Sequence, residues 1–496
     1  MRNMDQHAPH QDSTKIARTI RLLAILFLYC PLLLNVKARA ESNSDSFGFA
    51  TLDSPQSDMT ADAVAADAET ADDRQGVPNE KLPDVRDLST VMQSAQPPTT
   101  GENAAGAGSV MAQTPSPLPS NLNAQFSETD FQKSGQFDFN HFPPDFLSGA
   151  VIRSGPLVTK FGGYVKADLI HDFDPIDSTD QFDPTTIPVG APDRTNTRFH
   201  TRQSRLNMDN RWIVPGESPI RVMLEGDFFG DNSTFRLRHA YGESGTWLIG
   251  QTWSTFAHRA ALPNTLDSVG DVASIGRRQS QLRYTHHLID DRLLFSAALE
   301  NSQVRVDDVF LSVGTPRSEL PDAIVRLRLM SDSSQFQIAG LARRLGFQPN
   351  GQDVRSFTGR GMNATGLVDI TNDDRVYGGI LWGTGIGDYR DLPDLAPIST
   401  TQGKALESVA WYVGLKHQWS KAWSSNLTYS AAAVEHTAFQ PVDSLSKNRY
   451  MAANLIWKPR EHGFIGVEYL RGFRENGDGN GDVANRVMMS VGFILP

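Results

Sequence analysis

The sequence predicts an all-β fold: a 16-stranded antiparallel transmembrane β-barrel preceded by a disordered N-terminal region. The first observation is that apolar and polar residues alternate through about sixteen short segments after residue 160. The second is that none of these segments contains an apolar run long enough for a membrane helix. The third is that long and short linkers alternate between them. This pattern is typical of a transmembrane β-barrel, whose strands have one face toward lipid and the other toward water.

The expected strands are even in number, as in single-chain outer-membrane barrels. They cover residues 161–173, 198–212, 219–230, 235–243, 246–256, 279–288, 291–301, 321–330, 335–346, 361–371, 373–386, 406–418, 423–435, 447–458, 463–474 and 484–495. The linkers 174–197, 257–278, 302–320 and 387–405 are long, whereas 212–219, 287–292, 419–423 and 458–463 are tight. Short periplasmic turns and long outer loops give this asymmetry. Most of the 8 tryptophans fall near expected strand ends, where an amphipathic ring suits the headgroup layer.

The N-terminal third of the sequence is predicted to contain an export signal followed by a linker. Residues 1–40 resemble a signal peptide, because basic residues precede the apolar run Leu22 to Leu34 and Ala38-Arg39-Ala40 supplies a cleavage site. Residues 41–125 are rich in Ala, Asp, Ser, Gln and Pro, and we expect a disordered periplasmic or linker segment. We expect residues 126–160 to form a Phe-rich segment leading into the barrel, and residues 161–496 to form the outer-membrane β-barrel domain.

Composition excludes several function classes. The formal net charge is -11, with the acids concentrated in residues 41–87, so nucleic acid is not an expected partner. The single cysteine, Cys30, lies in the expected signal peptide, so the mature chain should have no thiol chemistry. The histidines are scattered and no nucleophile has a positioned base. We therefore expect no metal, no cofactor and no catalytic residue.

The candidate functional residues are arginines on one face of the expected strands. Period two places Arg205 and Arg211 on one face of the expected strand 198–212, opposite Leu206 and Trp212, while Arg202 falls on the second face. The same alternation places other arginines opposite apolar residues: Arg221, Arg236, Arg238, Arg283, Arg326 and Arg328. These arginines should face water, since a lipid-facing Arg at the bilayer midplane costs roughly 2 to 4 kcal/mol.

Two interpretations of these arginines stay open. The stretch from Ala167 to Gly403 contains no lysine, although lysine would serve equally for a diffuse positive field. The planar fork of Arg binds carboxylates bidentately, so its exclusive use favours anion recognition. The alternative is that the arginines pair with Asp209, Glu225 or Asp227 across the wall as structural ion pairs.

Several motifs in residues 161–290 resemble the DcaP-like porins of Gram-negative outer membranes. They are Gly163-Tyr164-Val165-Lys166-Ala167-Asp168, Arg202-Gln203-Ser204-Arg205-Leu206, Leu224-Glu225-Gly226-Asp227-Phe228-Phe229-Gly230, Arg236-Leu237-Arg238-His239-Ala240-Tyr241-Gly242-Glu243 and Gly250-Gln251-Thr252-Trp253-Ser254-Thr255-Phe256. The resemblance implies a homotrimer whose arginine-rich constriction passes small anions such as dicarboxylates. It also implies that Arg202, Arg205, Arg236, Arg238 and Arg283 contact the anion. Arg221 is a candidate by strand alternation alone.

The sequence therefore predicts a porin for passive diffusion in the outer membrane of a Gram-negative bacterium, with membrane lipid and small anionic solutes as partners. Two alternatives share the fold. One is a general or sugar-selective porin. The other is a structural outer-membrane protein anchored through its N-terminal tail.

Overall fold

The computed structural model of this chain describes residues 150–213, 216–399 and 402–495. The signal peptide expected at residues 1–40 and the disordered segment at 41–125 lie outside the described residues, as does the Phe-rich segment up to residue 149. In the described part of the chain, no helix is both long enough and apolar enough to cross a bilayer.

Sixteen strand positions form a continuous wall. In chain order they are β2 (Leu157–Asp172), β4 (Arg205–Trp212), β5 (Ile220–Asp227), β6 (Arg236–Ser244), β7 (Trp247–Trp253), β8 (Arg278–Ile289), β9 (Leu293–Glu300), β11 (Asp322–Met330), β12 (Ser334–Pro349), β13 (Arg355–Asp369), β14 (Asp374–Thr384), β17 (Glu407–Gln418), β18 (Trp423–Val434), β19 (Leu445–Arg460), β20 (Gly463–Asn476) and β21 (Gly481–Ile494). Shorter elements extend the wall or lie in its loops: β1 (Ala150–Ser154), β3 (Asn196–His200), β10 (Gly314–Ser318), β15 (Leu395–Pro397), β16 (Gly403–Ala405), helix α3 (Asp308–Val313) and the 3-10 turns η2 (Pro184–Thr186), η3 (Asp231–Ser233), η4 (Arg259–Ala261) and η5 (Gly387–Arg390).

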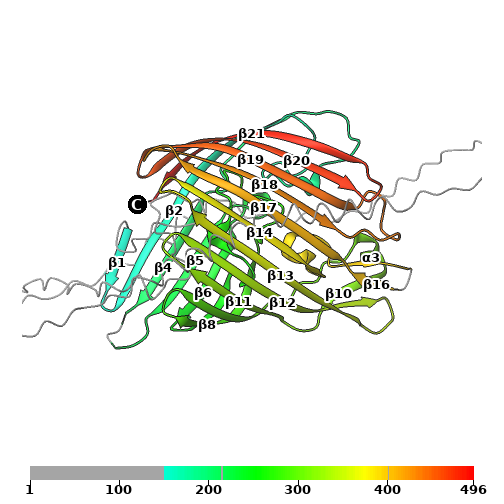
Figure 1. Ribbon diagram of the computed structural model, residues 1–496, viewed down its shortest axis with the longest axis horizontal. Coiled ribbons are helices and arrows are strands. Elements are labelled where there is room, and N and C mark those ends of the chain that lie inside the picture. The colour runs from blue at the N-terminus through cyan, green and yellow to red at the C-terminus, as the bar shows by residue number, and fades with distance from the viewer. Residues whose placement is uncertain (1–149, 214–215, 400–401, 496) are drawn as a thin grey trace, which may run out of the picture. The chain divides into compact units, whose positions relative to one another are not determined.

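The wall is a closed barrel (Figure 1). Neighbouring strands pair antiparallel around the sheet, and the last strand, β21, pairs with β2, with Tyr164 opposite Ile494 and Asp172 opposite Arg486. The turns at one end of the barrel, such as 461–462, are short and those at the other end are long. We call these the short-turn end and the loop end, and the short turns are periplasmic. The all-β, 16-stranded prediction is confirmed.

Every expected strand overlaps one wall position, but some boundaries differ. β2 begins at Leu157 rather than at residue 161. The expected strand 198–212 is divided into β3 and β4 by a turn in which the Ser204 amide donates to the Thr201 carbonyl. Gly163 of β2 faces this break with φ 137°, and a Cβ there would lie 2.1 Å from the Arg205 carbonyl oxygen, so the close approach requires glycine.

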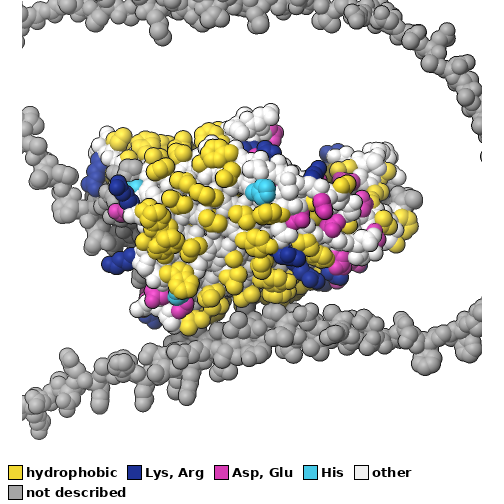
Figure 2. All heavy atoms as spheres, turned by 90° about the horizontal axis from the view of Figure 1, so that it is seen from above, with side chains coloured by type: hydrophobic (Ala, Val, Ile, Leu, Met, Phe, Trp, Pro, Cys, Tyr) yellow, Lys and Arg dark blue, Asp and Glu magenta, His cyan; other side chains and the backbone are white. Residues whose placement is uncertain are grey.

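Charged side chains are buried and apolar side chains are exposed along the wall. In β11 the exposed residues include Val325 and Leu327, while Asp322, Arg326 and Arg328 are buried. Figure 2 shows that apolar side chains cover much of one outer face. This order is the reverse of a water-soluble fold and fits a barrel with lipid outside and water inside. Exposed tryptophans such as Trp212, Trp247, Trp423 and Trp457 lie at the short-turn end.

Residues 254–277, between β7 and β8, fold into the barrel, and we call them the inner loop. Asn363 of β13 donates to the Phe256 carbonyl at 2.8 Å. Farther along, the Leu266 amide donates to Glu468 of β20 at 2.6 Å, and Lys166 of β2 donates to the Leu266 carbonyl at 2.6 Å. The inner loop therefore crosses the lumen and narrows it. Residues 302–320 instead form α3 and β10, and β10 extends the sheet by pairing with the end of β12.

Candidate functional site

A charged cavity of about 250 Å³ lies between the inner loop, the loop 173–195, the loop 385–406 and the β4–β8 wall. Seven arginines line it: Arg205, Arg236, Arg238, Arg259, Arg277, Arg278 and Arg390. Four aspartates also line it: Asp183, Asp267, Asp271 and Asp391. Cations therefore outnumber carboxylates on the cavity surface. We call Arg205, Arg236, Arg238, Arg259 and Arg278 the cavity cluster.

Three arginines of the cavity cluster share two carboxylates of β5. Glu225 Oε1 accepts from Arg238 Nε at 2.8 Å and lies 3.4 Å from Arg205 Nε. Asp227 accepts two hydrogen bonds from Arg236, at 2.9 and 2.8 Å, and a third from Arg238 Nη1 at 2.8 Å. A register shift between β5 and β6 at Glu225 aligns these groups at one level of the wall. The carboxylates fix the arginines without neutralising all of them.

Trp253 gathers two further arginines at the same level. The guanidinium carbon of Arg259 lies 3.9 Å from the Trp253 ring centroid, and that of Arg278 lies 4.7 Å from it. Cation–π attraction holds both groups at the ring without adding negative charge. Among the described residues no carboxylate forms an ion pair with Arg278, which lines the cavity. Arg278 therefore gives the cavity a positive charge that no ion pair offsets.

The aspartates of the cavity come from loops rather than from the β4–β8 wall. Asp267 accepts hydrogen bonds from the amides of Phe182, Val269 and Gly270 at 2.9 to 3.0 Å. Burial raises the pKa of Asp267 although these hydrogen bonds oppose the shift, and burial likewise raises the pKa of Asp271. Arg259, Arg277 and Arg390 also line the cavity from loops, so charges of both signs meet on the loop side of the cavity.

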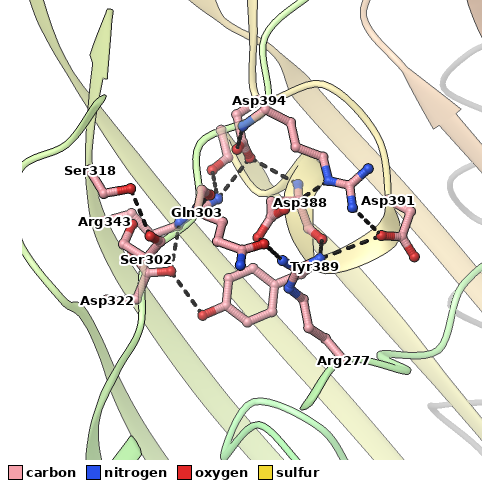
Figure 3. A network of polar contacts seen from close by, with 12 residues as sticks. Arg277, Ser302, Gln303, Ser318, Asp322, Arg343, Asp388, Tyr389, Asp391 and Asp394 are labelled. Carbon is pink, nitrogen blue, oxygen red and sulfur yellow. Dashed lines mark hydrogen bonds and ion pairs between the residues drawn. The ribbon is translucent and has the colours of Figure 1, made fainter. Parts of the chain in front are cut away.

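A second group of arginines, Arg277, Arg305 and Arg343, anchors the loop 385–406, and we call it the loop cluster. Figure 3 shows Arg277 and Arg343 of this cluster beside the aspartates of the loop. Arg343 Nε lies 2.9 Å from Asp322 Oδ2, and its Nη1 lies 2.7 Å from Asp394 Oδ1. The side chains of Arg343, Asp322 and Asp394 are fully buried. A buried pair of this kind is stable only while both partners are present.

The other two members of the loop cluster bind the 3-10 turn η5 and the residue after it. Arg305 Nε donates to Asp388 at 2.8 Å, and its Nη2 donates to Asp391 at 2.6 Å. Arg277 Nη2 lies 3.1 Å from Asp388 Oδ2. Tyr389 OH donates to Asp322 at 3.0 Å (Figure 3). The loop cluster therefore holds residues 389–391 at the edge of the cavity.

The predicted site residues separate into two groups. Arg205, Arg236 and Arg238 line the cavity together. Arg202 lies in the turn between β3 and β4, pairs with Asp180, and donates to the Gly230 carbonyl at 2.8 Å. Because Arg202 lies in this turn and not in a strand, strand alternation does not predict the direction of its side chain.

Arg221 and Arg283 lie outside the lining of the cavity. Arg221 is buried and lies 2.9 Å from Asp209 and 3.0 Å from Glu243, as the structural interpretation of the arginines predicts. Arg283 is buried in the wall on β8.

Sequence reasoning missed Trp253, Arg259 and Arg278 as a unit. Alternation along β8 directs Gln279 inward and would direct Arg278 outward. Trp253 and Arg278 are cross-strand partners at the ends of β7 and β8, where the chain leaves the sheet for the inner loop, and both line the cavity. The sequence feature that could have predicted this unit is the presence of an aromatic residue, Trp253, and a basic residue, Arg278, at the two ends of a long linker. In the described ranges no three His, Cys, Asp or Glu side chains are grouped as metal ligands.

The closed wall, the inner loop and the charged cavity define an outer-membrane porin, which is a channel and not an enzyme. Residues 152–343 match the family model described as DcaP outer membrane protein. The match covers less than half of the chain, so these residues are similar to that family, and the protein lies in the outer membrane of a Gram-negative bacterium. The resemblance drawn from the motifs is confirmed over these residues.

Three solved structures are similar to this chain. The outer membrane channel DcaP of Acinetobacter baumannii is 21% identical with a TM-score of 0.63, over 70% of this chain and 99% of that chain. An anion-selective porin from Comamonas acidovorans is 9% identical with a TM-score of 0.48, over 68% and 99% of the two chains. OmpF of Salmonella typhi is 9% identical with a TM-score of 0.47, over 70% and 100%. The first likeness supports the fold alone. A comparison with curated protein sequences found no match.

Proposed function

We propose that this porin passes small anionic solutes, dicarboxylates among them, through the cavity bordered by the cavity cluster. The process is passive and needs no cofactor. Arginine contacts replace part of the hydration of an anion as it crosses the narrow region, which lowers the barrier for anions more than for cations. A guanidinium fork also fits a carboxylate bidentately.

The observation that carries this proposal is that the arginines of the cavity cluster outnumber the carboxylates that pair with them. Three of its arginines share Glu225 and Asp227, and Arg278 lies on Trp253 with no ion-pair partner among the described residues. A purely structural role would favour one carboxylate for each arginine, as at Arg211 and Arg221 with Asp209 and Glu243. Excess positive charge beside a water-filled path favours anions.

The test is the reversal potential of the purified protein in a planar bilayer under a KCl gradient, followed by block with succinate and with a neutral sugar. We expect anion selectivity and block by succinate. Arg278→Gln should lower the ratio of chloride to potassium permeability roughly two- to fivefold, since one charge near the path is worth about 0.5 to 1 kcal/mol in water. Arg460→Gln, an exposed cation at the short-turn end of β19, is the matched control and should change nothing.

Other outcomes distinguish the alternatives. A conducting but unselective wild-type pore, or one that the sugar blocks and succinate does not, would replace the proposal with a general or sugar-selective porin. A structural protein would lose attachment on deletion of residues 41–149 while its barrel kept the same conductance.

We also propose a homotrimer, on the resemblance to DcaP-like porins. The mass of the detergent-solubilised protein by light scattering tests it, and a monomeric mass would contradict it.

A further inference from the structure

Four arginines lie on the outside of the barrel rather than in its lumen. They are Arg344 of β12, Arg360 of β13, Arg449 of β19 and Arg471 of β20, and all four are exposed. Their neighbours in the strands are buried and face inward, as Arg343 does beside Arg344 and Tyr450 does beside Arg449. Strand alternation therefore directs these four side chains toward the membrane.

These arginines lie at similar heights on the wall. They lie eight to eleven residues from the short-turn ends of their strands, counted from Ser334, Asp369, Arg460 and Gly463. Tilted antiparallel strands rise by about 3.4 Å per residue along their own axis, which places the arginines roughly 20 to 29 Å above that end. The apolar band of an outer-membrane barrel is about 25 Å tall. The arginines therefore lie at the outer boundary of the band.

The four arginines form two diagonal pairs of the same geometry. Arg449 is opposite Phe473 and Arg471 is opposite Met451, so Arg449 and Arg471 are two positions apart on adjacent strands. Arg344 is opposite Thr358 and Arg360 is opposite Ala342, which gives the same offset. Such diagonal positions are about 7 to 8 Å apart, within the reach of long side chains to a common ligand. We call these two pairs the outer pairs.

Within the part of the chain that the structure describes, Glu319 is the one carboxylate that forms an ion pair with an arginine of the outer pairs. Arg344 Nε lies 3.1 Å from Glu319. Arg449 lies over the Phe473 ring at 5.0 Å, and Arg471 donates to Asn485 Oδ1 at 3.2 Å. Among the described residues the side chain of Arg360 has neither a hydrogen bond nor an ion pair, although its backbone pairs with Thr384 in the sheet. Like charges directly opposite each other destabilise a sheet, and an anion bound between two diagonal arginines would likewise offset their repulsion.

We propose that each outer pair binds the phosphate of a phosphorylated lipid headgroup in the outer leaflet of the outer membrane. Arginine forks bind phosphate through charge-assisted hydrogen bonds. Exposed apolar residues lie on the same strands between each pair and the short-turn end: Met362 and Ile338, two and six positions from Arg360 and Arg344, and Val467 and Leu455, four and six positions from Arg471 and Arg449. A bound headgroup would place its acyl chains along these residues. A soluble anion would have no use for that apolar surface, which is why we favour the lipid.

The test uses the full-length protein in detergent and measures binding of lipid A carrying two phosphates by native mass spectrometry, with the melting temperature as a second readout. We expect bound lipid A and a higher melting temperature. The double variants Arg344→Gln/Arg360→Gln and Arg449→Gln/Arg471→Gln should each lose one class of bound lipid, with affinity at that site falling about tenfold or more. Arg460→Gln, on the same outer face of β19 but at the short-turn end, should bind like the wild type.

Three results would overturn the proposal. Lipid A stripped of phosphate could bind equally well, which would make the contact purely apolar. Inorganic phosphate could give the same melting shift, which would indicate a site for a soluble anion. A double variant could lose subunit association in the absence of lipid, which would assign the pairs to contact between copies of this chain. Unchanged channel conductance in the double variants shows that their barrels are folded.

Discussion

The cavity cluster and the loop cluster contain the same residue type and differ in their counterions. In the cavity cluster three arginines share Glu225 and Asp227, and two more lie on an aromatic ring. In the loop cluster Arg277, Arg305 and Arg343 meet four aspartates, Asp322, Asp388, Asp391 and Asp394. Arginine in excess over carboxylate borders the cavity, whereas arginine outnumbered by carboxylate anchors the loop 385–406. Under the proposed function, the ratio of arginine to carboxylate distinguishes arginines that attract a solute from arginines that hold the structure.

The largest effect that this comparison predicts follows from Arg343→Met in the loop cluster. The change leaves the fully buried Asp322 and Asp394 without their cation, so the free energy of unfolding should fall by about 3 to 5 kcal/mol. Urea titration of the protein folded in liposomes measures it. The adjacent Arg344→Gln removes an exposed ion pair and should cost less than about 1 kcal/mol. Equal losses in the two variants would contradict the assignment.

The next effect concerns Trp253 as a positioning residue of the cavity cluster. Trp253→Leu removes cation–π contacts worth about 0.5 to 2 kcal/mol to each guanidinium, so Arg259 and Arg278 should leave their places and anion selectivity should fall. Trp253→Phe keeps an aromatic face and should retain most of the selectivity. The reversal potential under a KCl gradient distinguishes them. Identical behaviour of the Leu and Phe variants would mean that the ring only fills space.

The smallest predicted effect is a dependence of selectivity on pH. Burial raises the pKa of Asp267 and Asp271 above the usual 3.8, so their carboxylates gain protons before ordinary aspartates do as the pH falls. The arginines keep their charge over this range. Anion selectivity should therefore rise as the pH is lowered from 7, with a midpoint above 3.8.

Asp271→Asn checks the cause of this pH dependence, because it should raise selectivity at pH 7 and reduce the further rise at low pH. The control is Asp231→Asn at an exposed 3-10 turn, which should leave the curve unchanged. A selectivity that falls as the pH is lowered would contradict the expected direction.

The wall of the barrel could be predicted because its periodicity has one physical cause. Lipid outside and water inside impose the same two-residue alternation on every strand, and a shift by one residue would reverse all faces. Arg205, Arg236 and Arg238 follow this rule and line the cavity. The short β10 contains Pro316, which weakens its strand signal, and it lies outside the sixteen predicted strands.

The inner loop and the rest of the cavity cluster could not be predicted in this way. Loops have no repeating pattern, and the position of the inner loop is fixed by contacts with distant residues, such as those of Leu266 with Lys166 and Glu468, 100 and 202 positions away. Arg278 lies at the point where strand alternation ends. A single sequence shows that such a loop is long but not which wall it meets.

Closure of the wall sets the order in which the barrel can assemble. Ser490 of β21 donates to Asp168 of β2 across 322 residues of chain. Until β21 arrives, β2 has a free edge of unpaired amides and carbonyls, which is costly in lipid and prone to pairing with other chains. The first wall strand must therefore wait for the last, and the edge of β2 stays open to pairing with other chains until β21 is in place.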